Sequence, residues 1–185
     1  MGFNPATFLK NLDRIITSGG FKKSIEVPLH SVCLFSDSSP LTTTTSTNPG
    51  FAAIETYFPV LTWAAGKVVK AGITFAIPDD YDASDDYLRI KIKACMAGAT
   101  DTTTALDATV YADDAASTDL DPTISADLSS TLAWVEINCD SQDLEPGDVI
   151  AIGLFPETHA TDAVEVYAIK IEYKSDLVYY TASSR

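Results

Sequence analysis

The sequence predicts an all-β protein built as an antiparallel β-sandwich, and two features of the pattern lead to this class. First, about seven short segments of β type follow one another from Lys67 to Tyr173, and each is bounded by Asp, Ser, Pro or Gly. Second, the last segment alternates without a break, with Tyr167, Ile169, Ile171 and Tyr173 on one side and Lys170, Glu172 and Lys174 on the other. Short strands with almost no helix between them are typical of a sandwich.

The expected number of strands makes the sandwich jelly-roll-like. With 185 residues, of which 46% are apolar, the chain has the size of one domain and enough apolar residues for a core. Weaker β-type segments at 25–27 and 31–35 bring the count to about eight strands, the number in a jelly roll. The Thr-rich tract at 42–47 is expected to be a loop, with an ordered edge as the alternative. An immunoglobulin-like sandwich is the nearest competitor, but the sequence has no paired cysteines that flank a tryptophan.

An N-terminal amphipathic helix is expected over the first 20 residues. Asn4 can cap it, Pro5 suits its first turn, and Gly19-Gly20 provides a stop. A lone helix of this length is marginal in water, so its apolar stripe must pack on its own sandwich or on a neighbouring subunit. The expected partner-binding residues are this stripe and the basic side chains near it: Phe8, Leu9, Leu12, Ile15, Ile16, Lys10, Arg14, Lys22 and Lys23. The chain is thus expected to divide into a helix or arm (1–28), a sandwich domain (29–176) and a tail (177–185).

The regular strands are expected at 67–78, 87–96, 106–112, 132–139, 149–155 and 164–173. The clearest is 87–96, where apolar residues alternate with basic ones. Its inward residues should be Leu88, Ile90, Ile92, Ala94 and Met96, and its outward residues Arg89, Lys91 and Lys93. Turns are expected at 79–82 and 145–148, because Pro fixes φ, Gly tolerates positive φ and Asp bonds its local backbone. Trp63 and Trp134 are expected in the core.

The charge of the chain limits its partners. Its 12 basic and 26 acidic residues give a formal net charge of -14, which disfavours direct binding to nucleic acid. Residues 1–28 carry +2 and the rest therefore carries -16, so the first segment is expected to contact something acidic. No apolar run approaches the length of a bilayer span, and no membrane association is expected. Cys33, Cys95 and Cys139 are expected to be buried free thiols of a protein that folds in a reducing cytosol.

The sequence offers few groups for chemistry. Only His30 and His159 are available for acid-base chemistry near neutral pH, and neither lies in a nucleophile motif. The aspartates at 79–86 could bind calcium through oxygen ligands, but they lack the Gly and terminal Glu of an EF-hand loop. A solvated acidic turn is the preferred interpretation. We therefore expect no catalytic residues, no metal and no cofactor.

Four stretches, 88–103, 106–114, 144–152 and 166–173, share an ordered strand texture, and they include a Leu-x-x-Gly-Asp turn at 144–148. Together they resemble β-sandwich structural proteins of tailed phages, in particular head decoration, or cement, proteins. The likeness covers about residues 67–174. It implies a small jelly roll that commonly associates in threes, sits on an assembled capsid and links neighbouring shell subunits. Residues 1–28 would be its projecting arm.

The leading hypothesis is accordingly a viral structural protein that decorates the capsid exterior and is assembled in the host cytoplasm. Its expected partners are the major capsid protein and further copies of itself, as a homotrimer. The alternative is a carbohydrate-binding or receptor-recognition module of a phage tail or spike, which would use aromatic residues such as Tyr57, Phe58, Trp63 and Tyr179-Tyr180. A hydrolase built on a sandwich is the third and least favoured hypothesis.

Overall fold

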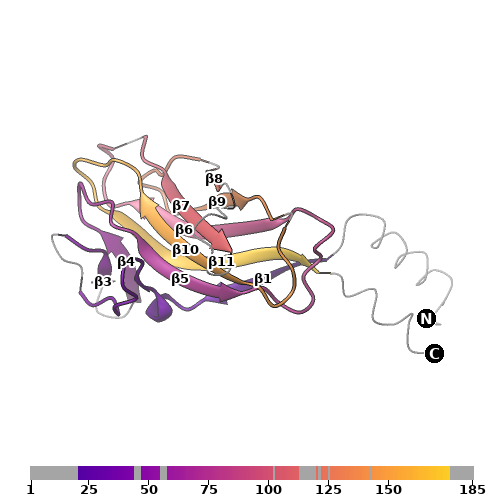
Figure 1. Cartoon of the computed structure of the whole chain (residues 1–185). Helices are drawn as coiled ribbons and strands as arrows, with labels where there is room; N and C mark the ends of the chain where they lie inside the picture. Colours follow the sequence, from indigo (N-terminus) through magenta and orange to yellow (C-terminus); the bar gives the residue numbers. More distant parts are fainter. Residues whose placement is uncertain are drawn as a thin grey trace, which may run out of the picture.

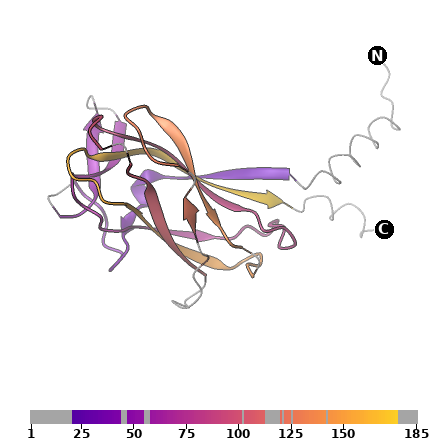
Figure 2. The same cartoon turned by 90° about the horizontal axis from the view of Figure 1, so that it is seen from above.

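The computed structural model describes residues 21–43, 47–54, 58–101, 103–112, 120, 122–124, 126–141 and 143–175. Over these residues the chain forms antiparallel sheets in a sandwich-like arrangement (Figures 1 and 2), which confirms the predicted all-β class. The expected helix at 1–20 and the expected tail at 177–185 lie outside the described residues. So do seven of the expected binding residues: Phe8, Leu9, Lys10, Leu12, Arg14, Ile15 and Ile16.

The larger sheet has seven strands and places the last strand of the chain in its middle. Its order is β3 (Gly50–Ile54), β4 (Phe58–Trp63), β11 (Val164–Ser175), β6 (Leu88–Met96), β9 (Ala133–Cys139) and β8 (Thr123–Ile124). The seventh strand, β1 (Phe21–Val27), pairs with residues 169–175 of β11, whereas β4 pairs with residues 164–166. β11 therefore has β6 along one side and β4 and β1 in succession along the other.

The smaller sheet has four strands in the order β2 (Cys33–Leu34), β5 (Ala71–Ala76), β10 (Val149–Pro156) and β7 (Leu106–Ala112). A short 3-10 turn, η1 (Leu29–Ser31), lies between β1 and β2. From β4 to β7, and again from β9 to β11, successive strands belong to opposite sheets. The chain thus crosses the core repeatedly, which brings residues distant in sequence into one cluster.

The six regular strands of the prediction are all present as β5, β6, β7, β9, β10 and β11. β5 begins later than expected, at Ala71, and β11 extends two residues further, to Ser175. β1 is longer than the segment expected at 25–27, so the last part of the expected arm, 1–28, includes a strand of the sheet. Thr43 forms a bridge to Phe51 at the start of the Thr-rich tract, and residues 44–46 lie outside the described part.

The core lies between the two sheets and follows the alternation of the strands. Leu88, Ile90, Ile92, Ala94 and Met96 of β6 are all buried, which confirms the inward face predicted for this strand. The smaller sheet adds further apolar side chains to the same cluster: Ile73, Val110, Ile150, Ile152 and Leu154. Complete burial of a side chain of this size stabilises a fold by about 1.5–3 kcal/mol. The sandwich is therefore held mainly by these two inner faces.

The two tryptophans lie in opposite environments. Trp63 is fully buried, and its Nε1–H donates a hydrogen bond of 2.7 Å to the carbonyl oxygen of Val69, so its predicted core location is confirmed. Trp134 is 43% exposed, and its predicted core location is wrong. The reason is register, because Trp134 lies directly opposite Lys93, on the outward face of β6.

The alternation of β11 is interrupted by a bulge, contrary to the prediction of one unbroken pattern. The register with β6 shifts between Val166 and Ala168, and Tyr167 is the extra residue. Val164 and Val166 are buried before the bulge, and Ile169, Ile171 and Tyr173 after it. Tyr167 is instead half-buried, and its hydroxyl donates a hydrogen bond of 2.9 Å to Oε2 of Glu165. An extra residue of this kind resets which side of a strand faces the core.

The turn at 145–148 is present as predicted. The N–H of Asp148 donates to the carbonyl oxygen of Glu145 at 3.2 Å, and Gly147 has φ of 95°, a conformation that favours glycine. Its backbone also holds the end of β5, because the N–H of Gly147 donates to the Ile77 carbonyl oxygen at 3.0 Å. The turn therefore fixes where β10 begins beside the end of β5.

Deletion of Tyr167 should leave the protein folded, because both halves of β11 then keep their buried sides in one continuous register with β6. Deletion of Lys170 is the matched control. It should unfold or severely destabilise the protein, since it turns buried residues of β11 toward solvent. Circular dichroism and urea unfolding of the two variants would check this, and equal stability of both would contradict the role given to the bulge.

Candidate functional site

The outward side of the larger sheet gathers half of the basic residues of the chain. Seven of the 12 lysines and arginines lie on β1, β6 and β11, although the whole chain has a net charge of -14. These seven are Lys22, Lys23, Arg89, Lys91, Lys93, Lys170 and Lys174. All except Lys23 share the side opposite the core. We call this side the charged face, made of Lys22, Ser24, Glu26, Tyr87, Arg89, Lys91, Lys93, Trp134, Glu136, Lys170, Glu172 and Lys174.

Strand pairing places charges in rows across this face. One row runs Glu136, Lys91, Lys170 and Glu26 across β9, β6, β11 and β1. Like charges directly opposite are unfavourable, but each lysine of the central pair has an acidic neighbour. Lys91 Nζ lies 3.0 Å from Glu136 and 3.5 Å from Glu172, and Lys170 Nζ lies 3.2 Å from Glu26. The hydrogen bond to Glu136 raises the pKa of Lys91, which burial opposes and Glu172 reinforces.

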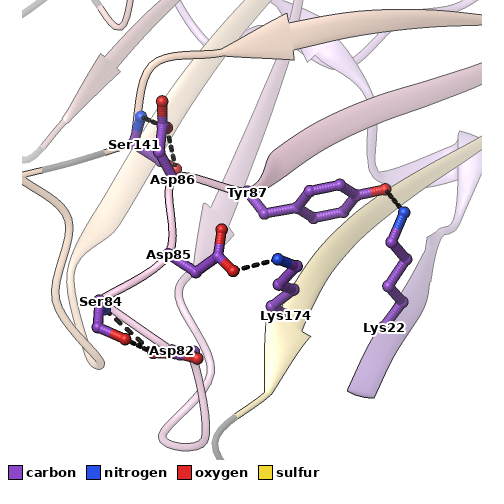
Figure 3. A network of polar contacts seen from close by, with 8 residues as sticks. All are labelled: Lys22, Asp82, Ser84, Asp85, Asp86, Tyr87, Ser141 and Lys174. Carbon is purple, nitrogen blue, oxygen red and sulfur yellow. Dashed lines mark hydrogen bonds and ion pairs between the residues drawn. The ribbon is translucent and has the colours of Figure 1, made fainter. Parts of the chain in front are cut away.

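Tyr87 connects β1 to the rest of the charged face (Figure 3). Lys22 Nζ donates a hydrogen bond of 2.6 Å to the Tyr87 hydroxyl. This hydroxyl in turn donates one of 2.6 Å to Oε1 of Glu172. The Tyr87 ring also has cations near it, with Lys22 Nζ at 4.2 Å and Arg89 Cζ at 4.6 Å from its centre. Burial acts to raise the pKa of Glu172, but the bonds from Tyr87 and Lys91 lower it overall. The carboxylate is therefore held in its charged form among the lysines.

The acidic turn that the sequence marked as a calcium candidate is bonded to cations and polar groups of the protein itself. Figure 3 shows Lys174 paired with Asp85 beside this loop. Asp86 accepts hydrogen bonds of 2.7 Å from the N–H and 2.9 Å from the hydroxyl of Ser141. Asp82 accepts bonds from Ser84. Among the described residues, no group of three or more His, Cys, Asp or Glu side chains is placed to hold a metal ion.

Asp80 ties the ends of β1 and β11 together on the other side of the sheet. Lys23 forms an ion pair with it, and the hydroxyls of Tyr173 and Ser175 donate bonds of 3.0 Å and 2.6 Å. Burial acts to raise the pKa of Asp80, but these three donors lower it overall. Burial and the contact with Asp80 raise the pKa of Tyr173 to about 12. Lys23, one of the expected binding residues, therefore serves this internal contact, whereas Lys22 lies on the charged face.

Trp134 is the large apolar side chain at one end of the charged face. Lys170 Nζ lies 5.3 Å from the centre of its ring, and Lys93 is its cross-strand neighbour. An open hollow of about 290 Å³ lies beside it, lined by Ser24, Lys91, Trp134, Glu136, Lys170 and Glu172. An exposed indole next to lysines and carboxylates suits a partner with both a flat apolar part and charged or polar groups.

The two histidines occupy different settings. His30 is exposed in η1. His159 is 1% exposed, and its ring nitrogens lie 2.9 Å and 3.1 Å from the carbonyl oxygens of Glu157 and Ala64. These contacts link the loop after β10 to the loop after β4. In this arrangement the ring of His159 acts as a connection between loops.

The charged face was not predicted as a site from the sequence, although Arg89, Lys91 and Lys93 were predicted to point outward. The signal available was that these outward residues are all basic in an acidic chain. What unites them with Lys22, Lys170 and Lys174 is the pairing of β1, β6 and β11, which spans most of the chain.

No protein-family model matches this sequence, and no curated protein shows significant similarity to it. Within the described residues, no helix has the length and apolar character needed to cross a membrane.

The Asp80 contacts should make stability depend on pH. Because the pKa of Asp80 is lowered on folding, its contribution is fully present above the ordinary value of 3.8 and is lost as the pH falls through the folded-state value. The variant Asp80→Asn should therefore be less stable than wild type near neutral pH, and the difference should shrink in acid. Urea unfolding between about pH 2 and 7 would measure it. The control Asp82→Asn, which alters bonds within one loop only, should show a smaller change, and an equal one would contradict the assignment.

Proposed function

We propose that this chain is a structural protein of a tailed phage, a head decoration or cement protein that binds the capsid exterior through the charged face. The observation that carries the proposal is the collection of six outward basic residues on one sheet of a chain whose net charge is -14. The resemblance of residues 67–174 to this family supports the viral role. Shell binding needs adhesion rather than a reaction, and a face with exposed charges and an exposed indole supports adhesion.

The distribution of charge would orient the protein on its partner. An acidic surface repels most of this molecule and attracts only the charged face, so encounters in the productive orientation are favoured. The exposed ring of Trp134 would then add apolar contact at one end of the interface. The partner surface that fits is an acidic patch of the shell protein with an apolar site beside it.

The part of the expected arm that precedes β1, residues 1–20, is proposed to add a second contact. Its expected stripe of Phe8, Leu9, Leu12, Ile15 and Ile16 could contribute several kcal/mol at about 25 cal/mol per Å² of apolar area buried on the shell. The resemblance implies association in threes, and self-association of any order would multiply such contacts.

A jelly-roll topology is also proposed, and the strand order supports it. If β4 to β11 are numbered one to eight, the larger sheet contains the order one, eight, three, six, and the smaller sheet contains two, seven, four. This is the order in which two nested Greek keys arrange their strands. The fifth strand, β8, lies beside β9, and the N–H of Leu120 just before it donates to the Val110 carbonyl oxygen in β7 at 2.8 Å. That segment therefore contacts both sheets at one corner.

A receptor-recognition or carbohydrate-binding module of a phage tail or spike is the second candidate. The exposure of Trp134 and the hollow beside it favour this alternative, because sugars stack on exposed indole rings. A glycan array distinguishes the two: binding that is lost in Trp134→Ala, with no binding to heads, would support recognition of a receptor.

Reversal of one charge on the face should weaken binding to the shell. In Lys93→Glu, binding to empty heads of the shell protein from the same genome should fall about tenfold or more, because the change removes one attraction and adds one repulsion. Co-sedimentation of the full chain at several salt concentrations would measure this. The control Lys67→Glu changes the net charge equally but lies in the loop between β4 and β5, so it should bind as wild type. Equal losses in both variants would show that only net charge matters.

Removal of residues 1–20 should leave a folded sandwich that binds empty heads less well. The expected reason is the loss of the apolar stripe, while the strands described above remain. Circular dichroism checks folding and co-sedimentation checks binding. Unfolding of the truncated protein would instead show that the segment belongs to the domain core.

A further inference from the structure

β1 has one edge that no other described strand occupies. β11 pairs with it along all seven residues, and five of these seven are exposed. Lys22, Ser24 and Glu26 belong to the charged face. Phe21 and Ile25 lie on the opposite side, and they are still 39% and 38% exposed. An exposed strand edge with apolar side chains is a surface on which another strand can pair.

The sequence of β1 is complementary to itself when read in the antiparallel direction. With Ser24 opposite Ser24 of a second copy, Lys22 lies opposite Glu26, and Phe21 lies opposite Val27. A two-fold axis makes each of these pairs occur twice. Centring the ladder on Lys23 or Ile25 would shorten it, and the first of these would place Lys23 against its own copy. The register centred on Ser24 uses the whole strand and pairs opposite charges.

We propose that β1 is a self-association edge, on which a second copy of this chain pairs antiparallel about Ser24. The new contact is compatible with the existing ion pair between Lys170 and Glu26. The carboxylate of Glu26 can accept bonds both from Lys170 and from Lys22 of the second copy. The two-fold axis runs perpendicular to the sheet, so the two charged faces lie on the same side of one continuous sheet. If the proposed function holds, this arrangement presents two charged faces to one acidic surface and increases the affinity for it through avidity.

Light scattering after size-exclusion chromatography of the full chain tests the pairing. One chain has a mass of 19.8 kDa, and wild type should have twice this mass. Lys22→Glu and Glu26→Lys each place like charges opposite one another at two positions, and each should weaken self-association about tenfold or more. Mixed together, the two variants should form a heterodimer, because the two glutamates of Lys22→Glu then face the two lysines of Glu26→Lys. Circular dichroism confirms that each variant is folded.

A cysteine at the two-fold axis provides an independent check of register. Directly opposite residues of an antiparallel pair have Cα atoms about 4.5–5.5 Å apart, which a disulfide can span. Ser24→Cys should therefore form a covalent dimer on oxidation, whereas Lys22→Cys and wild type should not.

Four results would overturn the proposal: a monomeric wild type, a mass of three copies, no heterodimer from the mixed variants, or dimerisation only after removal of residues 1–20. The last would mean that this segment covers the edge within one chain. Binding of wild type to empty heads is measured separately, so each of these results leaves the proposed shell binding open to its own test.

Discussion

The pairing of β11 with three other strands is the interaction on which the larger sheet depends. β6 runs along one side, while β4 and β1 share the other, and all three are joined through the backbone of one twelve-residue strand. The bulge at Tyr167 separates the part of β11 that pairs with β4 from the part that pairs with β1. It also turns the inward side of the strand by one residue, which lets Val166 and Ile169 both reach the core. If β11 kept all its residues but paired with β6 without the bulge, the buried side chains of one half of the strand would face solvent.

The charges of the chain are organised by the same sheet. A net charge of -14 disfavours compaction through repulsion, and the basic residues are placed where the strands bring acidic partners to them. Lys91, Lys170 and Lys174 each pair with a carboxylate, and Lys23 pairs with Asp80. Partly exposed pairs of this kind contribute little individually. Their main effect is to fix the orientation of side chains across β1, β6, β9 and β11, so that the charged face has a defined pattern.

Much of the fold follows from local patterns in the sequence, whereas the charged face does not. The alternation in 88–96 predicted both faces of β6, and Pro146-Gly147 predicted the turn before β10. The bulge escaped prediction because Tyr167 continues the apolar alternation of its neighbours, and only pairing with β6 shows that it is an extra residue. Trp134 was misplaced because its side is set by its partner Lys93 rather than by its own hydrophobicity. The face itself combines residues from 22 to 174, and no local pattern can report that Lys22 and Lys174 are neighbours.

The contrast between the two tryptophans has a spectroscopic consequence. The indole of Trp63 is enclosed and hydrogen-bonded to Val69, so its emission should be blue-shifted and insensitive to soluble quenchers while the core is intact. The indole of Trp134 is partly exposed beside Lys170, so iodide or acrylamide can reach it. One chain thus carries two intrinsic fluorophores that report on different events. Trp63 reports on unfolding of the core, and Trp134 reports on binding of a partner to the charged face.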